Sequence, residues 1–266
     1  MNELALINKF ICSFIKDNIK KANVNGAIIG LSGGIDSSVV GLLASQAIGN
    51  KNILGLILPD ENITPKEDID DAIDLCDNLK IKYKLIYINN IRNEFLRLIE
   101  KTENKLVQGN LISRIRMCIF YYYANLLNRI VLGTSNKTEI SIGYFTKYGD
   151  GASDFLPLGD LYKTQVIELA KFLNLSNNII NKKSSARLWK GQQTEEELGL
   201  SFKDLDSILI FIHKNSYSKS SIEVNDRFPH IPTEKIKHIL NLIENNKHKH
   251  TSFTICNLSQ FNPALN

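Results

Sequence analysis

A glycine-rich loop between a short apolar run and a helical pattern most constrains how this chain can fold. Residues 27–31 have the length and apolar character of a buried strand, and apolar residues from Val39 onward recur at helical spacing. Between them lies the sequence Ser32-Gly33-Gly34-Ile35-Asp36-Ser37-Ser38. Glycines let backbone N–H groups approach an anion, hydroxyls donate to phosphate oxygens, and a helix N-terminus favours negative charge. An ordinary capped turn does not need two glycines and so many hydroxyls, so the pattern predicts a phosphate-binding loop.

The remaining features of this loop narrow its class. Asp36 would repel a bare phosphate, and it is therefore expected to bind Mg²⁺. The loop lacks the GK[ST] ending of a Walker A loop and does not have the GxGxxG spacing of a dinucleotide turn. Kinase-like ATP hydrolysis and dehydrogenase chemistry are both disfavoured.

Apolar runs alternate with helical patterns along the first half of the chain. Three further runs occupy residues 53–58, 83–88 and 130–133, and a long helical pattern before the last of them carries Leu111, Ile115, Cys118 and Tyr122 on one face. This alternation predicts a doubly wound parallel sheet with helices on both faces, which binds ligands beyond the carboxyl ends of its strands.

The second half of the chain is mainly helical in pattern. Helices are expected over residues 202–214 and 233–246, and the pattern at residues 253–258 fits either a late strand or an arm. With 266 residues and 43% hydrophobic content, the chain can bury one large core, so residues 1–266 are expected to form a single domain.

Charge and cysteine usage limit the function classes. The net charge of +4 fits an anionic nucleotide substrate and does not indicate a nucleic-acid interface. The cysteines contain no CxxC pair, which argues against a zinc site or a redox dithiol and favours small core residues in a reducing compartment; they are Cys12, Cys76, Cys118 and Cys256.

The N-terminal segment is an amphipathic helix whose charges interrupt every apolar run, so a cytoplasmic protein without a membrane span is expected.

Two segments after the fourth apolar run carry candidate site residues. Thr134 ends the run and Glu139 follows five positions later, so Thr134 can meet a nucleotide and Glu139 can share the metal with Asp36. A capping threonine and a surface glutamate would explain the same pattern. Residues 143–154 form a loop by their glycines, yet this loop combines aromatic side chains with a lysine and two aspartates.

These motifs together resemble a known family. The first loop resembles the SGGxDS loop of the N-type ATP pyrophosphatases, which activate substrates as adenylates. The sequence FTKYGDGASD at residues 145–154 resembles the FTKYGDGxxD signature of NAD synthetases, and further matching segments run from the first helix to about residue 250. They are the GTSNKTE segment at 133–139, the segment at 157–164, the NxxxRxRM helix at 110–117, the loop at 185–192 and the HK pair at 248–249. The resemblance implies the Rossmann-like fold of the adenine nucleotide alpha hydrolases.

The resemblance also assigns roles to residues. Lys163 is implied as a catalytic residue that supplies charge to the phosphate loop, and Asp150 as the group that holds ammonium and accepts its proton. Mg²⁺ is implied on Asp36 and Glu139. The implied ATP contacts are Gly30, Leu31, Ser32, Gly33, Gly34, Ile35, Asp36, Ser37, Thr134, Lys163 and Ser185. The implied contacts with deamido-NAD are Arg114, Lys147, Asp154, His248 and Lys249.

The implied reaction is the ATP- and Mg²⁺-dependent amidation of deamido-NAD with free ammonia, through an NAD-adenylate and with release of pyrophosphate and AMP. No essential cysteine and no glutaminase domain are expected, and a homodimer whose interface includes the helix around Arg114 is implied. Two alternatives stay open: another amidating or thiolating pyrophosphatase that acts on GMP or tRNA, and a nucleotide-binding regulator without catalysis.

Other polar residues have simpler interpretations. Asp68, Asp70, Asp71, Asp74 and Asp77 are expected to form a solvated helix face, and Arg114 and Arg116 could also be solvated helix charges. His238, His248 and His250 are not expected to bind a transition metal.

One loop departs from the family pattern. Arg187 stands where the family usually has Asp, and Lys190 and Gln193 also differ, which leaves the closing geometry of this loop open. Trp189 is either a core anchor or a contact made by that loop.

Overall fold

The computed structural model describes residues 2–214 and 221–250 and contains a four-stranded parallel sheet. The strand order is β3-β2-β1-β4. The strands are β1 (Ala27–Gly30), β2 (Ile53–Ile57), β3 (Lys82–Leu85) and β4 (Ile130–Leu132). Ala27 of β1 is in register with Ile53 on one side and with Ile130 on the other. The predicted parallel sheet is confirmed, although the edge strand β3 ends earlier than the apolar run at 83–88 suggested.

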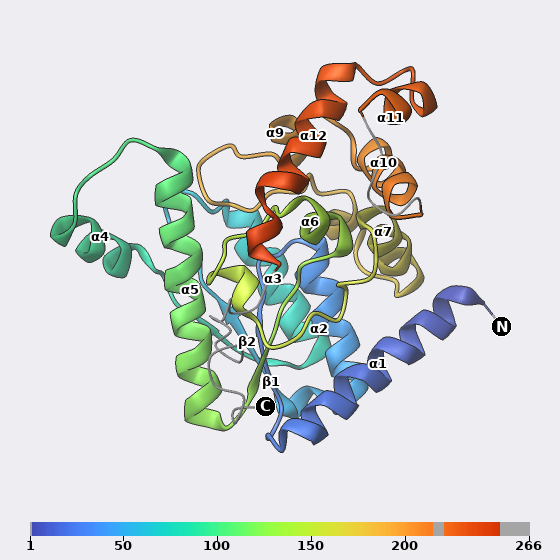
Figure 1. Cartoon of the computed structure of the whole chain (residues 1–266). Coiled ribbons are helices and arrows are strands. Elements are labelled where there is room, and N and C mark those ends of the chain that lie inside the picture. The colour runs from blue at the N-terminus through green and yellow to red at the C-terminus, as the bar shows by residue number, and fades with distance from the viewer. Residues whose placement is uncertain (1, 215–220, 251–266) are drawn as a thin grey trace, which may run out of the picture.

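Helices connect and cover the strands (Figure 1). The α-helices are α1 (Glu3–Ala22), α2 (Ile35–Ile48), α3 (Lys66–Leu79), α4 (Asn89–Leu98), α5 (Lys105–Leu127), α6 (Lys137–Ile142), α7 (Lys163–Phe172), α8 (Asn177–Ile180), α9 (Thr194–Leu198), α10 (Phe202–Lys214), α11 (Ser221–Arg227) and α12 (Thr233–Asn245). Short 3₁₀ turns occupy Asn50–Asn52, Asp150–Ala152 and Lys247–Lys249. The helices predicted at 202–214 and 233–246 are confirmed within one residue.

The sheet is covered on both faces because its side chains alternate between two cores. Ala27 and Ile29 pack with residues of α1, α2, α3 and α7. Ile28 and Leu54 point the other way and pack against the long helix α5, through residues such as Ile112. Continuous apolar runs are typical of parallel strands that are buried on both faces.

A third core joins α6 to the helices of the C-terminal half. Buried residues of α10, α11 and α12, among them Leu209, Val224 and Ile236, pack together with Ile142 of α6. These helices lie side by side at the upper right of Figure 1. Because α6 carries Glu139, this packing connects the C-terminal helices directly to the predicted site.

The cysteines differ in their burial, and one of them lies outside the described residues. Cys76 is a buried core residue as predicted, and Cys12 is half-buried, but Cys118 is exposed on α5 because it points away from the sheet. Cys256 and the segment 253–258 lie outside the described residues. Within residues 2–214 and 221–250, no helix is long and apolar enough to cross a membrane.

Candidate active site

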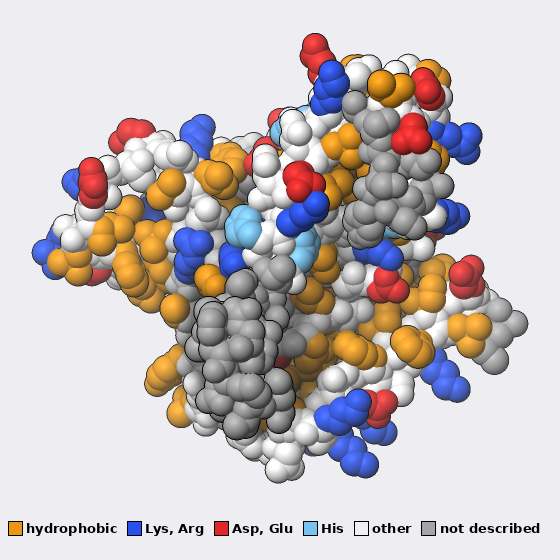
Figure 2. Space-filling model, in the orientation of Figure 1, with side chains coloured by type: hydrophobic (Ala, Val, Ile, Leu, Met, Phe, Trp, Pro, Cys, Tyr) orange, Lys and Arg blue, Asp and Glu red, His pale blue; other side chains and the backbone are white. Residues whose placement is uncertain are grey.

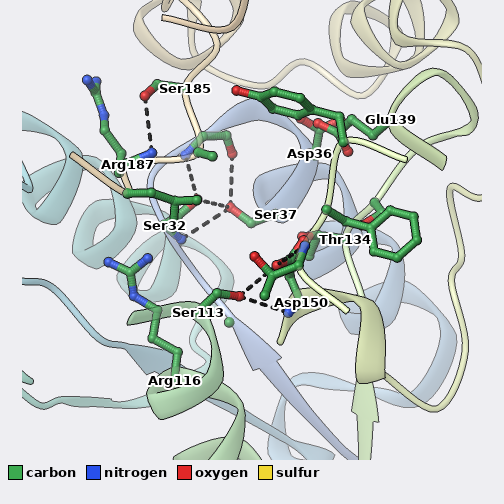
Figure 3. A pocket seen from close by; sticks show the side chains of 18 of the residues that line it. Ser32, Asp36, Ser37, Ser113, Arg116, Thr134, Glu139, Asp150, Ser185 and Arg187 are labelled. Carbon is green, nitrogen blue, oxygen red and sulfur yellow. Dashed lines mark hydrogen bonds between the residues drawn. The ribbon is translucent and has the colours of Figure 1, made fainter. Parts of the chain in front are cut away.

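A cavity of about 660 Å³ opens beyond the carboxyl ends of β1, β2 and β4. Its walls come from the loop at 30–37, from α5, from the segments around 133–150 and from the loop at 182–194. Figure 3 shows side chains from all these segments converging on one space. The cavity occupies the place where parallel sheets of this type bind ligands.

The loop between β1 and α2 is shaped by one glycine in particular. Gly33 has φ +72°, and a Cβ there would lie 2.1 Å from the backbone oxygen of Asp68, so only glycine fits. Gly34 has φ −89° and is the N-cap of α2, which means that only one of the two glycines uses a positive φ. The hydroxyls of Ser37 and Ser38 both donate to the Gly34 oxygen, at 3.0 and 2.8 Å.

The loop residues differ in their access to the cavity. Ser32, Asp36 and Ser37 line it, and Ser32 and Ser37 lie within hydrogen-bond distance of each other, with oxygens 3.2 Å apart (Figure 3). Ser38 is fully buried and lies outside the cavity lining, so its expected contact with phosphate is wrong. Its hydroxyl holds the first turn of α2 instead.

Asp36, Lys163 and Glu139 come together although they are far apart in the sequence. The ammonium of Lys163 forms an ion pair with Oδ2 of Asp36, and only 2% of the Lys163 side chain is exposed. Oδ1 of Asp36 accepts a hydrogen bond from the Asn136 amide at 3.0 Å. Asn136 is also the N-cap of α6 and forms a capping box with Glu139. The helix cap thus fixes both carboxylates relative to the lysine.

The electrostatics of this group follow from burial. The pKa of Glu139 is raised to about 8, chiefly by burial and then by the negative charge of Asp36, while Lys163 opposes the shift. For Lys163, burial alone would lower the pKa, but the carboxylates of Asp36 and Glu139 outweigh burial and the pKa is raised. Lys163 therefore stays charged, whereas burial and the nearby Asp36 disfavour the charged form of Glu139.

This carboxylate pair fits Mg²⁺. The ion usually takes one or two protein carboxylates and completes its shell with water and phosphate oxygens. Asp36 and Glu139 supply two carboxylates at the edge of the cavity, and a cation between them would remove the repulsion that contributes to the raised pKa of Glu139. Each oxygen of Asp36 already accepts one hydrogen bond, but a carboxylate oxygen has two lone pairs and can also bind a metal.

Asp150 lies in the same cavity on a short 3₁₀ turn. Its Oδ1 accepts a 2.6 Å hydrogen bond from the Ser113 hydroxyl and a 3.1 Å bond from the Thr146 N–H. The Asp150 N–H donates back to the Ser113 oxygen at 3.0 Å. Only Oδ1 takes part in these contacts, so the carboxylate is oriented by α5 and still open to the cavity (Figure 3).

The five residues expected to bind deamido-NAD do not lie in one place. Lys249 lines the cavity, where its ammonium donates to the oxygens of Gly143 and Phe145 at 2.6 and 2.9 Å. Arg114, Lys147 and His248 lie outside the cavity lining but form a connected group.

Within this group, the Arg114 guanidinium donates to the Lys147 oxygen at 3.2 Å, and the Lys147 ammonium donates to the His248 oxygen at 2.9 Å. The carboxylate of Asp154 accepts hydrogen bonds from the N–H of Val131 and the hydroxyl of Tyr121, at 2.7 and 3.1 Å. Asp154 therefore holds the middle of β4 and does not line the cavity.

The loop at 182–194 closes one side of the cavity through ion pairs with α3. Nε of Arg187 lies 2.6 Å from a carboxylate oxygen of Asp68, and the Lys182 ammonium lies 2.9 Å from the other oxygen. Lys182 also pairs with Asp71 at 2.5 Å and donates to the Gly33 oxygen at 3.0 Å. The prediction that Asp68 is a solvated helix charge is therefore wrong, because its carboxylate is buried under this loop.

Trp189 belongs to the same loop and lines the cavity, which decides between the two interpretations of this residue. It is a contact made by the loop and is only half-buried. Ser185 also lines the cavity, and its hydroxyl accepts a 3.1 Å hydrogen bond from the Arg187 N–H (Figure 3).

A family model described as NAD synthase matches residues 7–252. The chain belongs to the NAD synthase family. Members of the NAD synthase family are ligases that form a C–N bond and use ATP as a co-substrate. The order of the motifs along the chain had indicated this family, and the match covers all of them.

Relatives of this NAD synthase family member agree with it in length. The chain is 43% identical to an NH₃-dependent NAD⁺ synthetase of Archaeoglobus fulgidus, over 90% of this chain and 91% of the relative. It is 44% identical to a Thermococcus sibiricus protein of the same name, over 92% and 93%.

Two solved structures with at least 32% identity superpose over nearly the whole chain. The NMN synthetase from Francisella tularensis gives a TM-score of 0.84 at 33% identity and covers 97% of this chain and 100% of that one. The NH₃-dependent NAD synthetase from Campylobacter jejuni, in complex with nitrate, gives 0.80 at 32% identity with the same coverage. The predicted fold class is confirmed.

The sequence predicted many of the residues that line the cavity and missed others. All the expected ATP contacts line the cavity except Gly33, which supports the loop from outside. One of the missed residues is Arg116, expected only as a possible solvated charge although its side chain lies in the cavity wall (Figure 3). Its position on the face of α5 that also carries Ser113 and Met117, at helical spacing, was the available signal.

Proposed function

We propose that this chain makes NAD from deamido-NAD, ATP and free ammonia, through an adenylate that releases pyrophosphate and then AMP. The observation that carries the proposal is the convergence of the phosphate loop, the Asp36–Lys163 ion pair, Glu139 and Asp150 on one cavity. The names of the relatives, NH₃-dependent NAD⁺ synthetases, support ammonia as the nitrogen donor.

In the first step, the nicotinate carboxylate of deamido-NAD attacks the α-phosphorus of ATP, and pyrophosphate leaves. The N–H groups at the start of α2 and the hydroxyls of Ser32 and Ser37 would hold the leaving phosphates. Lys163 would add a fixed positive charge that needs no reorganisation, because Asp36 already holds it in place. Asp36 and Glu139 would hold Mg²⁺, which supplies charge neutralisation on the phosphates.

In the second step, ammonia attacks the mixed anhydride and AMP leaves. Asp150 would hold ammonium and take its proton, because its carboxylate faces the cavity while the Ser113 hydroxyl and the Thr146 N–H fix its orientation. No cysteine lines the cavity in the described part of the chain, in keeping with a reaction that needs no thiol nucleophile.

We propose further that the enzyme works as a homodimer and that deamido-NAD binds partly at the interface. Hydrophobic side chains gather over α4 and α5 in Figure 2. The exposed hydrophobic residues in and next to these helices include Tyr87, Ile91, Phe95, Leu98, Leu106, Val107, Tyr122 and Leu126. The strand β3, at the edge of the sheet, is also exposed. A contiguous apolar surface of this kind is typical of an interface between subunits. Arg114 lies on α5 and outside the cavity, where a second subunit could complete its site.

The test is conversion of deamido-NAD to NAD by the purified chain with ATP and Mg²⁺, with AMP and pyrophosphate followed separately. NAD formation with ammonium and none with glutamine alone is expected. Asp150→Asn is expected to keep pyrophosphate release and to lower the yield of NAD, and the matched variant Asp160→Asn, at an exposed carboxylate outside the cavity, is expected to behave like wild type. Absence of NAD under all these conditions would contradict the proposal.

A second candidate substrate comes from one structural neighbour, the NMN synthetase from Francisella tularensis. Nicotinate mononucleotide carries the same carboxylate as deamido-NAD and lacks the adenylate half. The same assay with the mononucleotide distinguishes the two substrates through the ratio of their kcat/KM values. A higher kcat/KM for the mononucleotide would replace deamido-NAD in the proposal and leave the two-step chemistry unchanged.

A further inference from the structure

The guanidinium of Arg116 lies in the cavity wall and is held by only one of its nitrogens. Arg116 is on α5, one turn beyond Ser113, and Nε donates to the Leu58 oxygen at 3.0 Å. Leu58 directly follows the central strand β2, so the arginine is anchored to the carboxyl end of the sheet. No hydrogen bond joins either terminal nitrogen of Arg116 to another residue within 2–214 or 221–250.

The other cavity cations whose contacts are known have protein partners. Lys163 pairs with Asp36, and Lys182 and Arg187 pair with carboxylates of α3. The Lys249 ammonium donates to two backbone oxygens. In contrast, no carboxylate oxygen lies within 4 Å of the Arg116 guanidinium in the described part of the chain.

The charge of Arg116 is therefore costly in the protein alone. The pKa of Arg116 is lowered to about 10, because the effect of burial outweighs the opposing negative charges of Asp60 and Asp150. The group stays charged at neutral pH. A buried charge is stable only when another group compensates it, and here the terminal nitrogens face the space that a ligand would fill.

The direction of the side chain indicates which ligand it meets. In Figure 3 the Arg116 guanidinium points from α5 toward Ser32 of the phosphate loop. Two terminal NH₂ groups in one plane match two oxygens of a phosphate, a geometry that lysine cannot supply. We propose that Arg116 binds a phosphate group of ATP in a bidentate manner, from a wall of the cavity that does not carry Lys163. This assignment rests on the proposed function, because it takes ATP as a substrate.

The assignment has a consequence for the order of events. Pyrophosphate leaves after the first step while AMP stays attached to the substrate. If Arg116 binds the α-phosphate, it keeps this contact with the adenylate until AMP leaves in the second step. If it binds the β- or γ-phosphate, the contact is lost when pyrophosphate leaves after the first step. Titration of Arg116→Met with AMP and with inorganic pyrophosphate distinguishes these two positions. Weaker binding of either compound than in wild type supports the proposal.

Calorimetric titration of the full chain with α,β-methylene-ATP and Mg²⁺ tests the inference. We expect Arg116→Met, which keeps the length of the side chain and removes its charge, to weaken binding by about 10- to 100-fold. Arg116→Lys should recover part of this loss, since the charge returns without the bidentate geometry. Binding of adenosine, which has no phosphate, should be the same in wild type and both variants.

Arg97→Met is the matched control, because Arg97 lies on α4 with its side chain two-thirds exposed and outside the cavity lining. It should bind the analogue like wild type. Thermal unfolding of each variant shows whether it is folded at the titration temperature, and if Arg116→Met is not, Arg116→Lys carries the comparison.

Several outcomes would overturn the inference. If wild type binds the analogue and both Arg116 variants bind it equally well, the inference fails while the proposed function stands. If Arg116→Met weakens only deamido-NAD, the arginine serves the dinucleotide and the assignment to ATP is wrong. If wild type itself does not bind the analogue, the inference and the proposed function fail together.

Discussion

The hydroxyl of Thr138 donates to Oδ1 of Asp206 at 2.5 Å and at the same time accepts a 2.9 Å hydrogen bond from the backbone N–H of Lys163. The other oxygen of Asp206 accepts the N–H of Thr164 at 2.8 Å. Asp206 is 1% exposed and lies on α10, whereas Thr138 and Lys163 belong to α6 and α7. One buried carboxylate therefore fixes the two short helices that carry Glu139 and Lys163.

Thr138→Val should disturb this arrangement while Thr138→Ser should not. Valine matches threonine in shape but leaves an oxygen of Asp206 and the N–H of Lys163 without a partner, which costs about 1–3 kcal/mol of unfolding free energy. A shift of Lys163 should lower kcat by about 10- to 100-fold. Urea unfolding and steady-state kinetics measure the two effects. Equal kcat for the serine and valine variants would show that the hydroxyl has no positioning role.

Lys163→Met should abolish most of the adenylation step. It removes a fixed positive charge at the phosphates, and losses of about 100- to 1,000-fold are typical when one such group is removed. Pyrophosphate release under single-turnover conditions measures this step directly. The matched control is Lys171→Met on the same helix, because Lys171 is more than half exposed and pairs with Glu168 on the surface. A similar loss in both variants would point to damage to α7 and away from a role in the site.

The Arg187–Asp68 ion pair should stabilise the closed position of the loop at 182–194. Arg187 has φ +51°, a conformation that costs a non-glycine residue about 1 kcal/mol, so the contact must compensate for it. A double-mutant cycle with Arg187→Gln and Asp68→Asn should give a coupling free energy of about 0.5–3 kcal/mol in unfolding. The cycle is needed because Asp68 also pairs with Lys182.

The surface pair Lys171–Glu168 provides the reference for this cycle, with an expected coupling of less than about 0.5 kcal/mol. Limited proteolysis within the loop should speed up in the Arg187 variant. A coupling no larger than that of the surface pair, with unchanged proteolysis, would show that the loop stays closed by other contacts.

The stability of the enzyme should fall below about pH 6.5 in part because of His213. Burial lowers the pKa of His213, the charge of Lys137 lowers it further, and Asp160 opposes the shift. Its Nδ1 lies 2.7 Å from the Tyr162 hydroxyl, next to Lys163. His213 binds a proton more readily in the unfolded chain than in the folded protein. Its contribution to the free energy of unfolding is therefore fully present above pH 6.5 and is lost as the pH falls below that value. His213→Gln should flatten the unfolding free energy between pH 7 and 5; an unchanged slope would assign the effect to other groups.

Thiol reagents should react with the exposed cysteine and not with the buried one, and the exposed cysteine should not be needed for activity. Burial, together with the negative charge of Asp77, raises the pKa of Cys76 to about 12, whereas Cys118 is exposed on α5. Iodoacetamide should therefore label Cys118 and not Cys76 in the native protein. Cys118→Ser should keep full NAD synthesis in freshly reduced protein. A large loss of kcat in this variant would contradict a mechanism without a thiol.

The sequence by itself determined the parallel sheet, the glycine-rich loop after β1 and many of the residues around the cavity. Apolar runs and helical spacing are local patterns, and the strands 27–30 and 53–57 follow from them directly. The motif between them needs glycine at Gly33, where any side chain would collide with the backbone of Asp68. Motifs of this kind hold most of their information within a few consecutive residues.

Only the tertiary structure decided how distant charges pair. Asp68 looked like one of several solvated acids on a helix, but the loop at 182–194 folds over it and supplies Arg187 and Lys182. Arg116 looked like a possible surface charge, but α5 turns it into the cavity. Burial depends on which segments meet in space, and the free energy of a charge depends on that burial. Spacing along the chain does not contain this information, and the folded arrangement does.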